Sequence, residues 1–338
     1  MDSAKSSAPA ILEYAPRVVS CLADAVASEP GELGRLCRHA LGVPSPGEAD
    51  APATGGKRIR PCLVLAACEA LGGNLDEAMP AAVAIEMVHN FSLVHDDIED
   101  GDQTRHGQPT VWKLAGEAQG INTGDYLVTR AIQHVVREVP DPSAARDIVS
   151  TLADAMTAMI RGQWQDIAFE TQATVPVEAY LDMIRGKTGA MLGAALEAGV
   201  IAAGQSGERR ARFREWGITL GLVFQARDDY LGTWGDPSQT GKAIGSDIRR
   251  RKRALPLLLA LEHPDTGSNM RNALDSTGDI DVEYVMALLE RAGTRNTMED
   301  RVARYRDQAL EALAQLELPP TAHSRFEELV HYFASRER

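Results

Sequence analysis

One stretch of the chain, SLVHDDIEDGDQTRHGQPT, gathers carboxylates at a spacing that could bind a metal ion. Asp96, Asp97 and Asp100 occupy positions i, i+1 and i+4, and on a helix these positions lie close together. Like charges at this spacing repel one another, so we expect a cation among them. Oxygen ligands suit a hard cation, Mg²⁺ in preference to Zn²⁺. The alternative interpretation is an acidic helix end exposed to solvent.

A second stretch, FQARDDYLGTWGDPSQTGK, again places paired aspartates, Asp228 and Asp229, after an apolar run. One acidic cluster of this kind is ordinary in a protein. Two clusters, each at the end of an apolar helix and each followed by a turn and basic residues, favour a common site. We expect the two clusters to face each other across one cavity, with metal ions and a polyanionic ligand between them.

The two clusters resemble the two aspartate-rich motifs of the trans-isoprenyl diphosphate synthases, the polyprenyl synthetase family. Three further segments are similar to motifs of that family and come in the same order. They are GGKRIRP at Gly55–Pro61, GQWQD at Gly162–Asp166 and KTG at Lys187–Gly189. The resemblance runs from about Gly55 to about Pro256, and agreement of several separate motifs makes it specific.

The resemblance implies an enzyme that joins an allylic diphosphate to isopentenyl diphosphate. The allylic C–O bond ionises, the isopentenyl double bond attacks the cation, and a proton is lost. Charge that develops on the leaving diphosphate must be stabilised, which Mg²⁺ would do. The expected metal ligands are Asp96, Asp97, Asp100, Asp228 and Asp229. No catalytic triad or cysteine nucleophile is needed.

The resemblance also implies roles for basic and polar residues. The expected contacts to the allylic diphosphate are Arg105, Lys187, Lys252 and Lys242. The expected isopentenyl diphosphate site consists of Lys57, Arg60, His89 and His106. Thr188 and Gln225 would orient the diphosphate or polarise the surroundings of the cation, although helix–helix hydrogen bonding explains these two residues nearly as well. The same ambiguity applies to Gln163 and Asp166.

The chain departs from the family pattern at two positions. Gly232 stands where many members carry a third aspartate, which weakens the expected metal site on that side. His106 stands where arginine is usual. Because histidine is only partly charged near pH 7, we expect weaker or pH-dependent binding of isopentenyl diphosphate.

Three residues upstream of the first acidic cluster are candidates for setting product length: Phe91, Ser92 and Met87. In the family, a bulky residue five positions before the first aspartate, with no insertion in the motif, is typical of geranylgeranyl diphosphate synthases. At about 100° per residue, Phe91 lies roughly 140° around the helix from Asp96. The resemblance, more than this angle, implies geranylgeranyl diphosphate as the product, with farnesyl or longer polyprenyl diphosphates as the alternatives. Ordinary core packing is the other interpretation of Phe91.

The surrounding sequence predicts an all-α protein. Apolar residues recur at helical spacing, and no alternating pattern typical of strands is found. The expected helices are 11–27, 31–41, 60–71, 75–99, 120–138, 142–170, 176–203, 207–231, 254–262, 280–292, 298–316 and 320–336. We expect residues 1–338 to form a single domain, a large helical bundle around a central cavity as in isoprenoid synthases. Residues 1–10 are expected to be poorly ordered, and the Pro/Gly/Ala-rich segment 42–56 is expected to be a loop.

Composition narrows the choice of function. The 338 residues are 44% apolar, with a net charge of -13 and a pI of about 5.1. An acidic protein is a poor candidate for binding nucleic acid or an anionic membrane surface. The N-terminus has no signal-peptide core, no apolar run is long enough to span a membrane, and the four cysteines suggest neither zinc nor disulfides. We expect a cytoplasmic protein and, from the resemblance, a homodimer.

Two other functions are considered. A class I terpene cyclase ionises a prenyl diphosphate but needs no second anion site, so the GGKRIRP segment argues against it. A cyclase would also be expected to carry serine or threonine at the position of Gly232. A non-catalytic regulatory subunit of a synthase would be expected to lose its aspartates, and this chain retains them.

Overall fold

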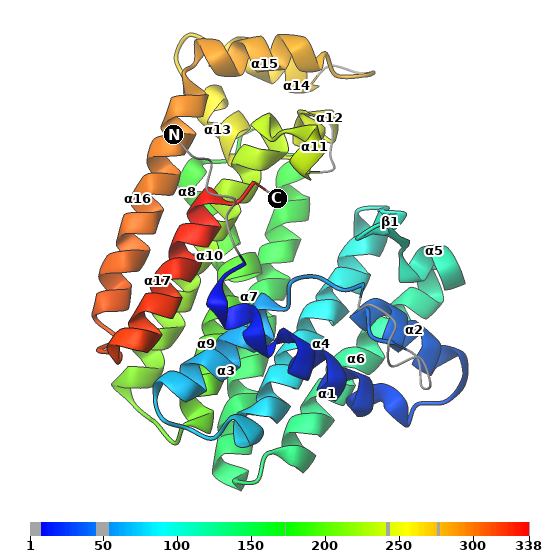
Figure 1. The fold of residues 1–338 in the computed structure, drawn as a ribbon. Coiled ribbons are helices and arrows are strands. Elements are labelled where there is room, and N and C mark those ends of the chain that lie inside the picture. Colours follow the sequence, from blue (N-terminus) through cyan, green and yellow to red (C-terminus); the bar gives the residue numbers. More distant parts are fainter. Residues whose placement is uncertain (1–7, 45–53, 173, 241–243, 276–277, 338) are drawn as a thin grey trace.

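The computed structural model describes residues 8–44, 54–172, 174–240, 244–275 and 278–337, and it confirms an all-α fold (Figure 1). The central helices pack against one another as neighbours. They are α3 (Ile59–Ala70), α4 (Leu75–Glu99), α7 (Pro142–Glu170), α9 (Ala190–Ala202) and α10 (Glu208–Trp234). Their shared apolar residues form one main core that positions the candidate site.

Other helices cover this centre. On one flank, α16 (Thr294–Ala314) and α17 (Pro320–Ser335) pack side by side on α10, and on another α6 (Glu117–Glu138) packs on α4 (Figure 1). The N-terminal part contributes η1 (Ala10–Tyr14), α1 (Ala15–Ala27) and α2 (Gly31–Leu41). The short elements are α5 (Val111–Ala115), α8 (Val177–Ile184), η2 (Arg185–Gly189), α11 (Pro237–Thr240) and α12 (Ser246–Arg249). A small second core joins α12 to α13 (Leu255–Glu262), α14 (Gly267–Asp275) and α15 (Val282–Arg291).

Local signals explain why the two long site helices begin where they do. The Asn74 side chain accepts a hydrogen bond from the Asp76 amide, which caps α4. Asp141 caps α7 in the same way, and Pro142 follows it at the first helical position. Both features favour a helix start, so the observed bounds of α4 and α7 agree with the expected ones.

Small residues let α10 approach α9 and the preceding turn η2 closely. A Cβ atom on Gly217 would lie 2.5 Å from the Gly193 α-carbon, and a Cβ on Gly221 would lie 2.5 Å from the Gly189 α-carbon. Larger side chains at these positions would force the two backbones apart. This contact holds Thr188 in η2 near Gln225 in α10.

Two departures from the expected elements fall at the candidate site. The expected helix 176–203 consists of α8, a π-helical turn η2 and α9. A short hairpin, β1 (Thr104–Arg105) with β2 (Gln108–Pro109), follows α4, where no strand was expected. The two turn residues between the strands, His106 and Gly107, have φ values of 50° and 77°, and positive φ at both positions is what a type I′ turn requires.

The remaining expectations concern the ends and surfaces. Residues 1–7 and 45–53 lie outside the described residues, while Ala10 begins η1 and the flanks 42–44 and 54–56 are non-helical. All four cysteines are free thiols. In the part of the chain that the structure describes, no helix is long and apolar enough to cross a membrane.

Candidate active site

A cavity of about 1400 Å³ lies between the C-terminal half of α4, the hairpin, α7, η2 and α10. Most of the predicted site residues line it. They are Lys57, Arg60, His89, Phe91, Ser92, Asp96, Asp97, Asp100, Arg105, His106, Lys187, Thr188, Gln225, Asp228 and Lys252. Met87 and Asp229 are buried nearby and do not belong to this lining, and Lys242 lies outside the described residues. Both acidic clusters therefore reach one cavity.

The first acidic cluster sits at the C-terminal end of α4, which is the negative end of the helix dipole. Asp96 is partly exposed and Asp100 is exposed, and neither carboxylate makes a hydrogen bond or ion pair with the described residues. Burial, reinforced by the charges of Asp100 and Glu99, raises the pKa of Asp96 to about 6. The helix dipole, the burial and the like charges all disfavour ionised carboxylates without a partner. A cation bound at the C-terminal end of α4 would therefore stabilise them.

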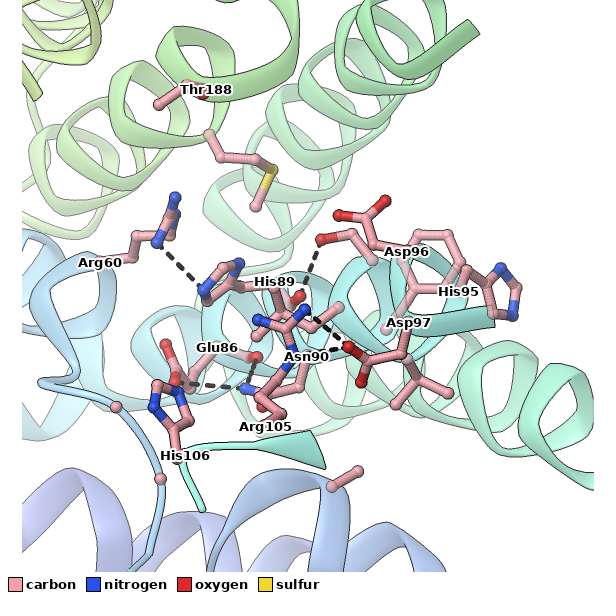
Figure 2. Close-up of a pocket in the computed structure, with 18 of the residues that line it drawn as sticks. Arg60, Glu86, His89, Asn90, His95, Asp96, Asp97, Arg105, His106 and Thr188 are labelled. Atoms are coloured by element: carbon pink, nitrogen blue, oxygen red, sulfur yellow. Dashed lines mark hydrogen bonds and ion pairs between the residues drawn. The ribbon is translucent and has the colours of Figure 1, made fainter. Parts of the chain in front are cut away.

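Asp97 is held differently from its neighbours. Its side chain is buried, and Arg105 Nη2 lies 2.7 Å from Asp97 Oδ1. Burial raises the pKa of Asp97, while the hydrogen bond from Arg105 opposes that shift. Figure 2 shows this pair between the end of α4 and the hairpin. Asp97 therefore anchors the hairpin to α4 and orients Arg105 at the cavity.

The residues expected to form the second anion site line the far side of the cavity (Figure 2). Arg60 Nη1 donates to His89 Nε2 at 3.1 Å, so His89 accepts there as a neutral imidazole. Burial, together with the charges of Arg60 and Arg105, lowers the pKa of His89 well below its ordinary value. Arg60 Nε is buried without a hydrogen-bond partner in the described part of the chain, which leaves a donor for an anionic ligand.

Two further basic residues border that side. Lys57 precedes α3 and contacts the hydroxyl and ring face of Tyr332 on α17. His106 is exposed at the tip of the hairpin, and Gly56 lies close to its ring. Partial desolvation of its ring, with the charges of Arg105 and Arg58, lowers the pKa of His106. His106 is therefore neutral at pH 8 and adds little attraction for an anion.

Lys187 and Asp166 come together because α7 and η2 touch. A Cβ on Gly162 would lie 2.5 Å from the Lys187 amide nitrogen, so only glycine permits this approach. Lys187 Nζ then lies 2.5 Å from Asp166 Oδ2. Thr188 in the same π-helical turn donates to Gln225 Oε1 at 3.2 Å. The turn thus directs one cation and one hydroxyl into the cavity.

In the second acidic cluster, the two aspartates have different surroundings. Asp229 is 1% exposed and accepts hydrogen bonds from Tyr180 at 2.7 Å and from Gln225 at 3.0 Å. Its Oδ2 atom also lies 3.3 Å from the Leu255 amide. Burial raises the pKa of Asp229 to about 7, although Lys252 and these donors oppose the shift. Asp229 is occupied in holding α8, α10 and α13 together.

Asp228 is half exposed and lines the cavity. Its only ion-pair partner among the described residues is Arg336, which follows α17 and lies 2.9 Å away. Lys252 lines the cavity on the same side. Burial alone would lower the pKa of Lys252, but the surrounding carboxylates, first Asp247 and Asp166, outweigh burial and raise it, so Lys252 is a cation.

The candidate ruler residues lie on α4. Phe91 is half-buried, lines the cavity and makes an edge-to-face contact with His95, with ring centroids 4.9 Å apart. Ser92 also lines the cavity, but its hydroxyl donates to the His89 carbonyl at 2.8 Å. Met87 is fully buried. Phe91 is therefore the bulkiest of the three side chains that reaches the cavity.

The carboxylates fit Mg²⁺ as a shared ligand rather than a protein cage. Among the described residues, no three histidine, cysteine or acidic side chains converge tightly enough to hold an ion alone. Mg²⁺ does not require such a cage, because it usually keeps several waters and binds one or two carboxylates together with substrate phosphates. Asp96 and Asp100, which lack partners, and Asp228 are suitable donors for that arrangement.

Three contributors were not expected from the sequence: Arg336, Tyr332 and Asp247. Arg336 and Tyr332 belong to the C-terminal segment and carry no motif. Asp247 lies against Gly232 on α10. The only sequence signal for Asp247 was Gly232, because glycine at that position leaves the second acidic motif one carboxylate short of the usual family pattern.

Comparison with known proteins agrees with this geometry. Residues 49–291 match the polyprenyl synthetase family. The chain is 36% identical over 289 residues to (2E,6E)-farnesyl diphosphate synthase of Mycobacterium tuberculosis, covering 83% of this chain and 80% of the relative. It is also 36% identical over 273 residues to geranylgeranyl diphosphate synthase of the same organism, covering 80% and 78%. The crystal structure of a polyprenyl synthetase from Streptomyces coelicolor superposes with a TM-score of 0.86 at 34% identity, covering 96% of this chain and 98% of that one.

Proposed function

The chain belongs to the polyprenyl synthetase family and is a chain-elongating prenyl diphosphate synthase, and we propose that it depends on Mg²⁺ and forms geranylgeranyl diphosphate. One observation carries the proposal: both acidic clusters and two separate sets of cations line a single cavity of about 1400 Å³. A volume of that size can enclose two prenyl substrates and hold them in reacting positions.

The allylic diphosphate would bind where the acidic clusters meet. Lys187, Arg105 and Lys252 line that part of the cavity and would contact diphosphate oxygens. Asp96, Asp100 and Asp228 would hold Mg²⁺, which when bound neutralises charge on the leaving diphosphate. Asp97 and Asp229 were also expected as ligands. Both oxygens of Asp229 accept hydrogen bonds, and Asp97 Oδ1 is paired with Arg105, which favours a positioning role for these two residues instead.

Isopentenyl diphosphate would bind on the opposite side. Arg60 offers its unpartnered Nε, and Lys57 and the start of α3 lie beside it. The amides at a helix start favour an anion. His89 accepts from Arg60 and so fixes the direction of its guanidinium. A cyclase would have no use for this second site, and a non-catalytic subunit would have no use for the retained aspartates.

Gln225 would lie between the two sites, and hydrogen bonds hold both its carbonyl oxygen and its amide nitrogen. Thr188 donates to its carbonyl oxygen, and its amide donates to Asp229 at 3.0 Å. The Gln225 dipole is thereby fixed at the edge of the cavity before a substrate arrives. A preorganised dipole next to the ionising carbon stabilises positive charge without reorganisation.

The proposed product and assembly rest on two further observations. Phe91 lines the cavity at the position expected for a ruler, which supports geranylgeranyl diphosphate over shorter or longer products. We also propose a homodimer, because α7 exposes three apolar side chains at i, i+4 and i+7. They are Ile160, Trp164 and Ile167, exposed by 56%, 71% and 43%. A cytoplasmic location stays an expectation from the sequence.

The test is incubation of the protein with Mg²⁺, isopentenyl diphosphate and each allylic primer in turn, followed by chromatography of the dephosphorylated products. We expect a C20 product that disappears on addition of EDTA. Asp96→Asn should abolish most turnover while its melting temperature in EDTA stays the same or rises, because a repelling charge is removed. Full turnover in excess EDTA would refute the metal requirement, and cyclised hydrocarbon without chain growth would refute the synthase.

A further inference from the structure

The departure at Gly232 has a structural counterpart on another helix. Gly232 follows Asp228 by four residues on α10, so a side chain there would share its face. A Cβ atom on Gly232 would lie 2.7 Å from Asp247 Cγ and inside contact distance of Asp247 Oδ2. The carboxylate of Asp247 therefore occupies the space in which an aspartate side chain at position 232 would begin.

The backbone around α12 fixes Asp247 in that place. The Gly245 amide donates to the Thr233 carbonyl at 3.3 Å, and the Lys252 amide donates to the Asp247 carbonyl at 3.0 Å. Ile248, next to Asp247, is fully buried in the second core. These contacts tie α12 to the end of α10, so Asp247 stays against Gly232 rather than swinging freely.

A second pocket next to Gly232 is lined by both carboxylates and basic side chains, so it could bind a metal ion together with an anion. Its volume is about 520 Å³, and it adjoins the main cavity through shared lining residues such as Asp228 and Lys252. Arg253, 8% exposed, lines this pocket. Its Nη2 atom donates to the Gln172 carbonyl at 3.3 Å and lies 3.7 Å from Asp275 Oδ1, whereas its Nε and Nη1 atoms have no hydrogen-bond partner in the described part of the chain. Buried donors without acceptors are costly, so these two N–H groups favour binding of an anion in this pocket.

We propose that Asp247 supplies the carboxylate that the second acidic motif lacks, so that Asp228 and Asp247 together bind the metal that carries the allylic diphosphate. Arg253 and Lys252 then meet the diphosphate oxygens from the same pocket. Asp229 is left to position the helices, because Tyr180, Gln225 and the Leu255 amide already use its oxygens. The inference rests on the proposed metal-dependent function and reassigns one of its ligands.

The test measures Mn²⁺ binding by electron paramagnetic resonance in the presence of inorganic diphosphate, without turnover. Asp247→Asn should weaken Mn²⁺ binding by about tenfold or more, the range seen when groups of a metal site are removed. Glu170→Gln is the matched control, since it removes one negative charge from the same pocket, and it should change binding less than twofold. Melting temperatures in EDTA show whether each variant is folded.

A carboxylate swap gives a second measurement. Asp247→Ala makes room at position 232, and adding Gly232→Asp should restore Mn²⁺ binding to near the wild-type level. A folded swap that binds no better than Asp247→Ala overturns the inference, even if Asp247→Asn itself fails to fold. An Asp247→Asn variant that matches Glu170→Gln also overturns it while leaving the metal-dependent function intact. Absence of Mn²⁺ binding in the wild type refutes both.

Discussion

Arg336 Nη2 donates a hydrogen bond to Asp228 Oδ1 at 2.9 Å. The Arg336 guanidinium also lies 3.9 Å from the ring centroid of Phe224, and its side chain is 9% exposed, whereas that of Asp228 is 49% exposed. A cation from the segment after α17 thus pairs with the carboxylate that the proposed metal site would use. Metal binding must compete with this pair.

We predict that Arg336→Met lowers the Mg²⁺ concentration for half-maximal activity. A half-exposed ion pair is worth about 1 kcal/mol or less, so the shift should be about fivefold at most. A Mg²⁺ titration of initial rates measures it. Arg212→Met, which removes an exposed pair with Glu208 at the start of α10, is the control and should leave the titration unchanged. An unchanged or higher Mg²⁺ requirement in Arg336→Met would show that Arg336 does not compete with the metal.

His106→Arg should strengthen binding of isopentenyl diphosphate at pH 8. The pKa of His106 is lowered by burial and nearby arginines, so the wild-type side chain is neutral at that pH. Arginine is always charged and can contact a phosphate through two N–H groups. We expect the KM for isopentenyl diphosphate to fall about threefold or more, with less difference once the pH falls below the lowered pKa of His106 and the histidine becomes charged.

The neutral variant His106→Gln is the control for that comparison. It should keep the KM of the wild type at pH 8, and at a pH below the lowered pKa of His106 its KM should exceed that of the wild type. If His106→Arg leaves the KM unchanged at pH 8, the hairpin tip does not reach the diphosphate.

The raised pKa of Asp229 predicts how the free energy of unfolding of the metal-free protein changes with pH. The pKa of this buried carboxyl is raised from 3.8 to about 7 in the folded state. A raised pKa means that the folded state binds the proton more tightly, so the stabilisation is complete below about pH 4 and is lost as pH rises to about 7. Each pH unit in that window costs at most about 1.4 kcal/mol.

Urea unfolding in EDTA at several pH values measures this dependence. Asp229→Asn cannot ionise, so its free energy of unfolding should fall less between pH 5 and pH 7 than that of the wild type. Equal slopes for the two proteins would mean that Asp229 titrates near its ordinary pKa, and that the hydrogen bonds from Tyr180 and Gln225 hold a carboxylate rather than a carboxylic acid.

Structural features that depend on residues close together in the sequence could be predicted. The start of α4 depends on Asn74 and that of α7 on Asp141, each only two residues from the amide that it caps. The acidic clusters could be placed on one cavity because their motifs carry a family resemblance. The two-residue strands of the hairpin are too short for any periodicity, so the element that carries Arg105 was missed.

Contacts between distant segments could not be predicted from the sequence. Arg336 is 108 residues from Asp228 in the sequence, and no motif near either residue indicates that the two form an ion pair. The same holds for Asp247, which fills the space at Gly232 only because α12 folds back on the end of α10. The contacts at Asp97 Oδ1 and at both oxygens of Asp229 likewise become visible only in three dimensions, since the sequence shows four equivalent-looking aspartates in two pairs.

The last prediction concerns the length of the product. Phe91 is half-buried, lines the cavity and rests against His95, so Phe91→Ala should open apolar space for further isoprene units. A prenyl chain can fill such space at a gain of about 25 cal/mol per Å² buried. We expect the products to shift from C20 to longer chains, with initiation on the short primer retained.

Met87→Ala separates a ruler from ordinary packing. Met87 is fully buried on the same helix, and the described residues that line the cavity do not include it. Its truncation should cost about 2–5 kcal/mol of stability without changing the product. Phe91→Ala should cost less than the roughly 3–5 kcal/mol of a fully buried phenylalanine, because its ring is only half-buried. If Phe91 limits chain growth, Met87→Ala should therefore lower the melting temperature more, whereas Phe91→Ala should lengthen the product more. If Phe91→Ala loses stability and still makes only the C20 product, its ring packs without limiting the chain, and Ser92 becomes the next residue to test.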